Sequence, residues 1–255
     1  MTGTASDTAR RVDYAAATDA GLVRPGNEDA HGAVADQGLF TVADGLGGHR
    51  AGEEASALAV AGFLETFLAH RDIADERRGA FLVAAVGRAH DAVRAATAAD
   101  QRRAGMGTTL VAAWIPPDRD EMWVVNVGDS RAYLLHEGAL EGLTLDDTLL
   151  EAMRRAGTLP ADPALWPPRQ QLTQALGPME FVVPRVTVTS LSAGDRMLLC
   201  TDGLTDMVDD AEITTVLAGE PDPERACAEL IRMANRNGGI DNVTVVVIAL
   251  EAAAP

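Results

Sequence analysis

The stretch Leu39–Gly48, LFTVADGLGG, sets the pattern on which both the fold and the site depend. Its run LFTVA is typical of a buried strand and leads directly to Asp44. The same order recurs where WVVNVG precedes Asp129 and where RMLLCT precedes Asp202, whereas Asp241 stands just before the run NVTVVVIAL. In antiparallel sheets the end of one strand lies beside the start of its neighbour. The sequence therefore predicts that these four aspartates converge on one edge.

Glycine follows Asp44 and Asp202 directly, and glycine permits tight turns in which a backbone carbonyl approaches a ligand closely. Carboxylates and carbonyls without clustered His or Cys form an all-oxygen site, which favours magnesium or manganese over zinc. Asp-Gly is also a common turn dipeptide, and GDSR at Gly128–Arg131 fits a plain hairpin turn equally well. Asp241 could simply start a strand. The prediction of a metal site therefore depends on the joint pattern.

Composition excludes several classes of protein. All 21 basic residues are arginine, so neither a P-loop lysine nor Schiff-base chemistry is available. The net charge of −17 makes nucleic acid an unexpected partner. The longest apolar runs, Leu110–Ile115 and Val243–Leu250, are too short to span a bilayer. The first residues lack the apolar core of a secretory signal, so we expect a cytoplasmic protein without membrane contact.

The two cysteines, Cys200 and Cys227, are too few for a disulfide framework and are interpreted as buried thiols. A thiol-based phosphatase carries an arginine six residues after its cysteine, to cradle the phosphate. The residues at those positions are Asp206 and Met233. This signature is therefore absent.

Alternation and β-branched content predict an α+β chain. We expect a single domain over residues 12–250, with short tails at 1–11 and 251–255. Three runs between Thr108 and His136 are separated by short breaks and predict an antiparallel meander. The expected strands are Val12–Thr18, Leu39–Ala43, Thr108–Ile115, Glu121–Val127, Arg131–His136, Val182–Leu191, Arg196–Thr201 and Asn242–Leu250. The expected helices are Gly52–His70, Arg77–Ala99, Thr148–Gly157, Ala211–Leu217 and Asp222–Asn237.

Two segments carry more specific expectations. In the first expected helix, one apolar face is formed by Ala55, Leu58, Ala59, Phe63 and Leu68. The irregular stretch Pro160–Pro168 predicts an excursion from the core, within a flap region spanning residues 146–180.

Six segments together resemble the motif series of the PPM (type 2C) metal-dependent protein serine/threonine phosphatases, bacterial branch. The match runs from about Thr18 to Leu250, and six motifs in the right order are very specific. The segments are TDAGLVRPGNED (18–29), ADGLGGH (43–49), GMGTT (105–109), NVGDSRAYL (126–134), LLCTDGLTD (198–206) and GGIDNVTVVV (238–247).

The resemblance implies an α-β-β-α sandwich, in which two packed antiparallel sheets are flanked by helices. It also implies a site with two Mn²⁺ or Mg²⁺ ions and a weaker third. Asp44 resembles the carboxylate that bridges the two metals, and the Gly45 carbonyl resembles a ligand of the second. Asp202 and Asp241 resemble the remaining ligands of the first metal, and Asp129, with Asp202, resembles the holder of the third.

Further residues take their roles from the same resemblance. Arg24 occupies the place of the arginine that grips the substrate phosphate, for which a guanidinium fork is well suited. The implied catalytic residues are thus Arg24, Asp44 and Asp202. Glu28 and Asp29 stand where the family has acids that hold metal-bound waters, and Asp206 stands close to the third metal. The implied reaction is hydrolysis of phosphoserine and phosphothreonine by a metal-bridging hydroxide, without a protein nucleophile.

The chain departs from the family pattern at two positions. Leu46 replaces the histidine proposed in many eukaryotic members as the proton donor, which leaves His49 and a metal-bound water as candidates. Gln174 stands where bacterial relatives often carry arginine, near the flap.

Two other functions stay open at this point. One is a catalytically inactive relative that binds phosphoproteins, although all four aspartates are present. The other is an enzyme with the same metal core that acts on small phosphate esters. The expected partners of an active enzyme are phosphorylated proteins and a cognate Ser/Thr kinase, with a monomer as the default state.

Overall fold

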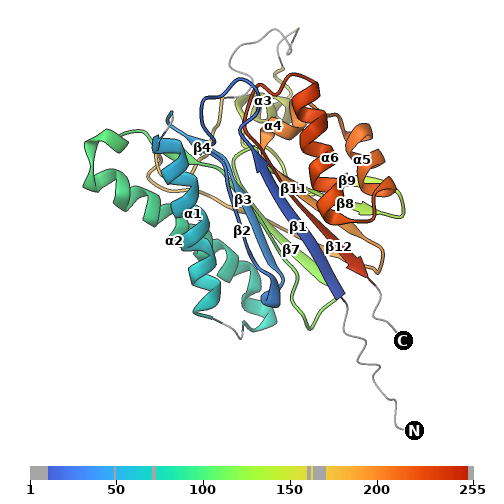
Figure 1. Ribbon diagram of the computed structural model, residues 1–255. Helices are drawn as coiled ribbons and strands as arrows, with labels where there is room; N and C mark the ends of the chain where they lie inside the picture. Colours follow the sequence, from blue (N-terminus) through green and yellow to red (C-terminus); the bar gives the residue numbers. More distant parts are fainter. Residues whose placement is uncertain (1–10, 49, 71–72, 160–161, 163–170, 252–255) are drawn as a thin grey trace.

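The computed structural model describes residues 11–48, 50–70, 73–159, 162 and 171–251. Two five-stranded antiparallel sheets pack face to face, and helices cover the outer face of each (Figure 1). This is the α-β-β-α sandwich that the family resemblance implied. The candidate site lies at one end of the sandwich, and both ends of the described chain lie at the other (Figure 1).

The first sheet has the order β1-β12-β11-β8-β9, and all of its neighbours are antiparallel. Its longest pair joins β1 to β12, in which Arg11 lies opposite Glu251. Strand β1 therefore begins, and β12 ends, one residue beyond the predicted limits of the domain. The strands are β1 (Arg11–Asp19), β8 (Arg131–His136), β9 (Ala139–Gly142), β11 (Arg196–Cys200) and β12 (Val243–Glu251).

The second sheet has the order β10-β7-β6-β3-β2. Its strands are β2 (Ala30–Val34), β3 (Leu39–Ala43), β6 (Leu110–Trp114), β7 (Glu121–Val127) and β10 (Arg185–Ser190), and a small separate ribbon pairs β4 (Gly45–Leu46) with β5 (Gly107–Thr108). Alternate residues of both sheets, such as Phe40, Val111, Met197 and Val246, form a core between them. This buried layer fixes the relative placement of the strand ends.

Two long helices, α1 (Arg50–Leu68) and α2 (Arg78–Ala99), cover the second sheet. Ala55, Ala59, Phe63 and Phe67 are buried at intervals of four residues, so one stripe of α1 faces the core. Leu68 is 52% exposed, so the prediction that it belongs to this stripe was wrong. A step of five residues from Phe63 turns it away from the stripe.

Helices α5 (Asp210–Gly219) and α6 (Pro223–Arg236) cover the first sheet. Both begin at side-chain caps: Asp209 and Glu212 form a reciprocal capping box at α5, and Asp222 accepts from two backbone N–H groups at α6. Two short helices, α3 (Leu149–Ala156) and α4 (Asp202–Thr205), lie near the site end. No helix in the described ranges is long and apolar enough to cross a membrane.

The predicted meander from Thr108 to His136 was wrong. Strands β6 and β7 form a hairpin, but β8 lies in the other sheet between β9 and β11. Residues 128–130 therefore carry the chain across the sandwich. Gly128 has φ +100°, and a side chain there would press against Thr109, so glycine is needed at this crossing.

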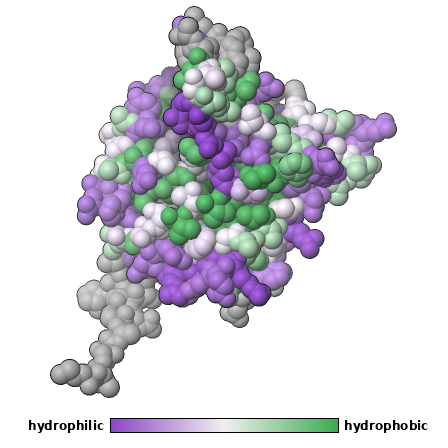
Figure 2. All heavy atoms as spheres, turned by 180° about the vertical axis from the view of Figure 1, so that it is seen from behind, coloured by the Kyte–Doolittle hydropathy of each residue, from purple (hydrophilic) through white to green (hydrophobic). Residues whose placement is uncertain are grey.

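Some elements differ from the prediction in extent. The short elements β2, β4, β5, β9 and α4 were not predicted, and β10 is shorter than the predicted strand Val182–Leu191. Most of the predicted excursion at Pro160–Pro168 lies outside the described residues, as does His49. Figure 2 shows the face opposite to that of Figure 1, where apolar side chains gather in a band between more polar areas.

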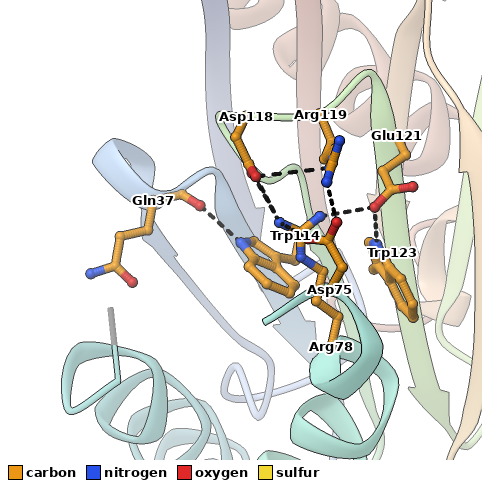
Figure 3. Close-up of polar contacts among 8 residues, drawn as sticks. All are labelled: Gln37, Asp75, Arg78, Trp114, Asp118, Arg119, Glu121 and Trp123. Atoms are coloured by element: carbon orange, nitrogen blue, oxygen red, sulfur yellow. Dashed lines mark hydrogen bonds and ion pairs between the residues drawn. The ribbon is translucent and has the colours of Figure 1, made fainter. Parts of the chain in front are cut away.

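An arginine cluster occupies the end of the second sheet that is remote from the four aspartates. The buried guanidinium of Arg78 bonds to Asp118 (2.9 Å) and Glu121 (3.0 Å) and pairs with Asp75 (3.0 Å) (Figure 3). It also lies 5.3 Å from the centre of the Trp114 ring. These contacts attach the start of α2 to the β6–β7 turn.

Candidate metal centre

Asp44 is held where β3 ends. Its backbone N–H donates to the Thr109 hydroxyl (2.9 Å), and its carbonyl accepts from Thr109 N–H (2.9 Å). The Thr109 hydroxyl also forms a hydrogen bond with the Ser130 hydroxyl (2.7 Å), and Ser130 directly follows Asp129. Thr109 thus links the ends of β3 and β7 within the second sheet, which brings Asp44 and Asp129 to the same end.

Asp202 and Asp241 come from the first sheet. Asp202 begins α4 directly after β11, and Asp241 precedes β12, the strand that pairs with β11. Thr201 and Thr244 tie these strand ends together, since Thr201 N–H donates to the Thr244 carbonyl (3.1 Å). The four aspartates therefore lie at one end of the sandwich, but the ends of two sheets supply them, not one edge of a single sheet.

Asp29 lies beneath this cluster. One of its carboxylate oxygens accepts from the hydroxyls of Thr201 (2.8 Å) and Thr244 (2.7 Å). In the part of the chain that the structure describes, its other oxygen, Oδ1, is buried and has no hydrogen-bond partner. Among the described residues, Oδ1 of Asp202 is likewise buried without a hydrogen-bond partner. Buried oxygens without a donor are costly, and a cation is the partner that both would accept.

Four of the acids at this end of the sandwich, Asp29, Asp44, Asp129 and Asp202, have raised pKa values. Burial, followed by repulsion from Asp202, raises the pKa of Asp129 to about 8. The pKa of Asp44 is raised well above its usual range by burial and by the charges of Asp202, Asp29 and Asp129. Burial also raises the pKa of Asp29 to about 7 and that of Asp202 to about 6. These shifts mark a desolvated group of like charges.

The aspartates open into two neighbouring cavities. The first, of ≈ 410 Å³, is lined by Asp44 and Asp241 together with Arg24. The second, of ≈ 250 Å³, is lined by Asp129 and Thr205. Asp202 and Asp206 line both cavities, so the carboxylates face accessible space.

Gly45 lies in close contact with two neighbouring backbone segments. Its N–H donates to the Glu28 carbonyl (3.1 Å), and a Cβ at this position would collide with the carbonyls of Glu28 and Gly52. Gly52 in turn packs against the Glu28 carboxylate, which leaves no room for a side chain there. The chain therefore needs glycine at both positions to bring Glu28 against the Asp44 loop.

Arg24 lies in the same cavity but is engaged with a carboxylate. Its Nη2 donates to Oδ2 of Asp241 (2.6 Å), while Oδ1 of Asp241 accepts from the backbone of Asn242 (2.8 Å). Among the described residues, no three His, Cys, Asp or Glu side chains are already arranged to hold a metal ion. In this arrangement Arg24 competes with any cation for Oδ2 of Asp241.

The donor set fits a hard divalent cation. It consists of carboxylate and carbonyl oxygens, with two buried carboxylate oxygens left without donors. Magnesium and manganese keep several waters, so few protein ligands are enough. The residues present therefore fit the implied metals.

Sequence reasoning missed several supporting residues. The Asn242 side chain accepts from Glu28 N–H (2.8 Å) and donates to the carbonyls of Ala20 (3.0 Å) and Gly26 (2.8 Å). Thr201 and Thr244 were missed too. Asn242 and Thr201 each stand beside an acid in a strand-end motif, and Thr244 is a polar residue within an apolar run, but neither signal indicates the partner.

The two departures from the family pattern have clear positions. Leu46 lines the first cavity beside Asp44 and carries no proton to donate. The Gln174 amide bonds to the backbone of Val183 in both directions, at 2.8 and 3.4 Å. Gln174 thus closes the loop that leads to β10.

The protein is an α-β-β-α sandwich with an all-oxygen acidic cluster where its two sheets end, which is the arrangement of a divalent-metal-binding protein. The family model described as Protein phosphatase 2C matches residues 25–241, and the chain belongs to this family. All six motif segments that carried the resemblance lie wholly or partly within that range. The resemblance to the PPM phosphatases is therefore confirmed.

Relatives and solved structures agree with this assignment. The chain is 42% identical to serine/threonine protein phosphatase PstP of Mycobacterium tuberculosis over 92% of its length and 44% of PstP, so it spans about half of that relative. It is 34% identical to serine/threonine phosphatase stp of Listeria innocua, over 91% of this chain and 93% of stp. The catalytic domain of PstP in complex with two manganese ions has a TM-score of 0.81 at 38% identity, covering 94% of this chain and 98% of that one.

Proposed function

We propose that the protein is a metal-dependent phosphatase of phosphoserine and phosphothreonine in proteins. The observation that carries the proposal is the cluster of desolvated aspartates, whose negative charges outnumber the two arginines, Arg24 and Arg131, that line its two cavities. Such a cluster is electrostatically unfavourable until cations enter it. The relatives named above are serine/threonine phosphatases, which supports the same activity.

Each residue receives a role. Asp44, Asp202 and Asp241 would hold the first of two Mn²⁺ or Mg²⁺ ions, and Asp44 with the Gly45 carbonyl would hold the second. Asp129 with Asp202 would hold a weaker third ion in the neighbouring cavity, which they line together. Bound there, divalent cations lower the pKa of a water and neutralise charge on the phosphoryl oxygens.

The chain itself positions the phosphate. Arg24 can bind two phosphate oxygens once its guanidinium is free of Asp241. Asp29, fixed by two threonine hydroxyls, keeps one buried oxygen without a donor, which can hold an ordered water. Leu46 cannot donate a proton. The proposed donors to the leaving oxygen are therefore a water molecule and His49, which lies outside the described residues.

The decisive test is phosphate release from phosphothreonine peptides with Mn²⁺, with Mg²⁺ and with EDTA. We expect turnover with either cation and none with EDTA. Binding of the peptides without turnover would instead identify an inactive phosphoprotein-binding relative. Turnover of p-nitrophenyl phosphate but of no peptide would identify an enzyme of small phosphate esters. A cognate Ser/Thr kinase is the proposed source of the substrates.

A further inference from the structure

Three large apolar side chains are exposed beside the candidate metal centre. Leu22 is 70% exposed, Val23 is 65% exposed and Ile240 is 49% exposed. Leu22 and Val23 directly precede Arg24, and Ile240 directly precedes Asp241. Ile240 lines the same cavity as Arg24 and Asp241. We call Leu22, Val23 and Ile240 the apolar rim.

The two loops that form the apolar rim are locked together. Leu22 N–H donates to the Gly239 carbonyl (2.7 Å). Gly21 has φ +74°, and a Cβ there would collide with the carbonyls of Gly239 and Asp241. A Cβ on Gly239 would lie 2.9 Å from the Leu22 side chain. The rim is therefore a preformed surface, and binding to it requires little ordering of the chain.

Asn242 secures the rim from below. Its side chain, which is buried, bonds to the backbone on both sides of Arg24, at Ala20 and Gly26. The same bonds therefore fix the position of the rim relative to the arginine. Ile240 lines the cavity that holds Arg24, and the Leu22 side chain lies beside Gly239, so a ligand with its phosphate on Arg24 has neighbouring atoms close to the rim.

The rest of the cavity has the opposite character. The acids that line it are Glu28, Asp44, Asp202, Asp206 and Asp241. Cations and Arg24 would offset these acids, so the bound phosphate dianion itself is what repels an acidic residue beside it, whereas an apolar residue can leave water against the rim. Charge and apolar exposure thus favour the same occupant, a peptide segment whose phosphorylated residue has an apolar neighbour.

We propose that the apolar rim binds the side chain next to the phosphorylated residue and selects phosphorylation sites with an apolar neighbour. This inference rests on the proposed phosphatase function and names a substrate class for it. The rim can discriminate only among peptide and protein substrates, because a small phosphate ester has no neighbouring side chain that could bind to it.

The test uses short phosphothreonine peptides with Leu, Gly or Asp on either side of the phosphorylated residue. For the wild-type protein with Mn²⁺ we expect kcat/KM to be about tenfold higher with Leu than with Gly at the preferred position, and lowest with Asp. In the double variant Leu22→Ser/Ile240→Ser, the Leu-to-Gly ratio should fall to within about twofold of unity, while the discrimination against Asp stays. Each kcat/KM is divided by that of the same variant for p-nitrophenyl phosphate.

Leu68→Ser is the matched control, because Leu68 is 52% exposed at the far end of α1. It should keep the full Leu preference. Equal rates with Leu and Gly in the wild-type protein would overturn the inference, as would a Leu preference that survives in the double variant. If neither p-nitrophenyl phosphate nor any peptide is hydrolysed, the proposed function fails separately, and fluorescence anisotropy of labelled Leu and Gly phosphopeptides then decides for or against the rim.

Discussion

The two ends of the second sheet hold buried charge in opposite ways. At one end the arginine cluster places Arg78, whose side chain is 4% exposed, among Asp75, Asp118 and Glu121, which are 31–59% exposed (Figure 3). At the other end Asp44, Asp129 and Asp202 lie together with desolvated carboxylates, and Arg24 pairs with Asp241, whose side chain is 32% exposed. The positive charge of Arg78 is balanced by acids of the same chain. The negative charges of the aspartates are mostly not balanced by cationic side chains.

The difference separates a structural contact from a functional one. A buried ion with partners from its own chain attaches elements to each other, as Arg78 attaches α2 to the β6–β7 turn. A buried group of like charges weakens the fold unless a ligand of opposite charge enters. The metal-free site is thus expected to oppose folding, and the arginine cluster to support it.

Substitution of Asp44 should have the largest effect. We expect Asp44→Asn to lower kcat/KM for p-nitrophenyl phosphate by at least about 10³-fold, because the bridging charge is lost. In EDTA at pH 8 its melting temperature should equal or exceed that of the wild-type protein, since one repelled charge is gone. Asp75→Asn makes the same chemical change at the other end and should keep its activity. Near wild-type activity in Asp44→Asn would show that Asp44 bridges no metal.

Manganese should reduce the pH dependence of stability. The folded protein raises the pKa of Asp29 to about 7 and that of Asp129 to about 8, so it holds protons that the unfolded chain has released. In EDTA the unfolding free energy should therefore fall between pH 6.5 and 8.5, by up to about 1.4 kcal/mol per pH unit for each proton held. Mn²⁺ at a hundredfold excess over its Kd should add about 2.7 kcal/mol at pH 8 and less at pH 6.5.

His136 also contributes to the pH dependence of the unfolding free energy, and its contribution must be measured separately. The hydrogen bond to Asp195 raises the pKa of His136, and the stability from that contact is likewise lost as pH rises through the raised value. His136→Gln removes this contribution and should leave most of the slope in EDTA. Urea unfolding that is independent of pH in EDTA, or unmoved by Mn²⁺, would contradict a metal site in the aspartate cluster.

The arginine cluster provides the reverse experiment. Arg78→Met keeps an apolar stem but removes the counter-charge of three acids, and should lower the unfolding free energy by about 2 kcal/mol in urea. Arg119→Met is the matched control, because Arg119 is 51% exposed, and should cost less than about 1 kcal/mol. Neither substitution should change kcat with Mn²⁺. A loss of activity in Arg78→Met at full folding would show that the two ends are coupled.

Much of the fold and the site could be predicted because several strands end in a recognisable sequence pattern. An apolar run followed by an acid marked Asp44, Asp129 and Asp202, and all three end strands at the same end of the sandwich. The sheet to which each strand belongs could not be predicted. Strand β8 has the same apolar content whether it continues a hairpin or crosses to the other sheet, and only Gly128 hinted at an unusual turn.

Contacts distant in sequence were also out of reach. Asn242 bonds to Glu28 across 214 residues, and Thr201 to Asp29 across 172. Neither pair has a spacing that one chain alone reveals. The pairing of Arg24 with Asp241 was not predicted for the same reason, although the motifs indicated a role for each residue.

That pairing allows a last and smaller prediction, which asks whether Arg24 resembles Arg78. A structural arginine would lose stability on removal, but the Arg24 side chain is 50% exposed, so we expect Arg24→Ala to change the unfolding free energy by less than about 1 kcal/mol. If Arg24 binds phosphate, KM for p-nitrophenyl phosphate should rise about tenfold. Mn²⁺ should bind more tightly by calorimetry, because Asp241 no longer has a competing cation.

Arg102→Ala controls for the loss of one positive charge, since Arg102 is 90% exposed and pairs with Asp100 away from the aspartates. It should change neither KM nor the affinity for Mn²⁺. Unchanged kcat/KM in Arg24→Ala would remove Arg24 from the phosphate site. Weaker Mn²⁺ binding would show instead that the guanidinium holds Asp241 in place for the metal, which would make Arg24 a structural counter-charge like Arg78.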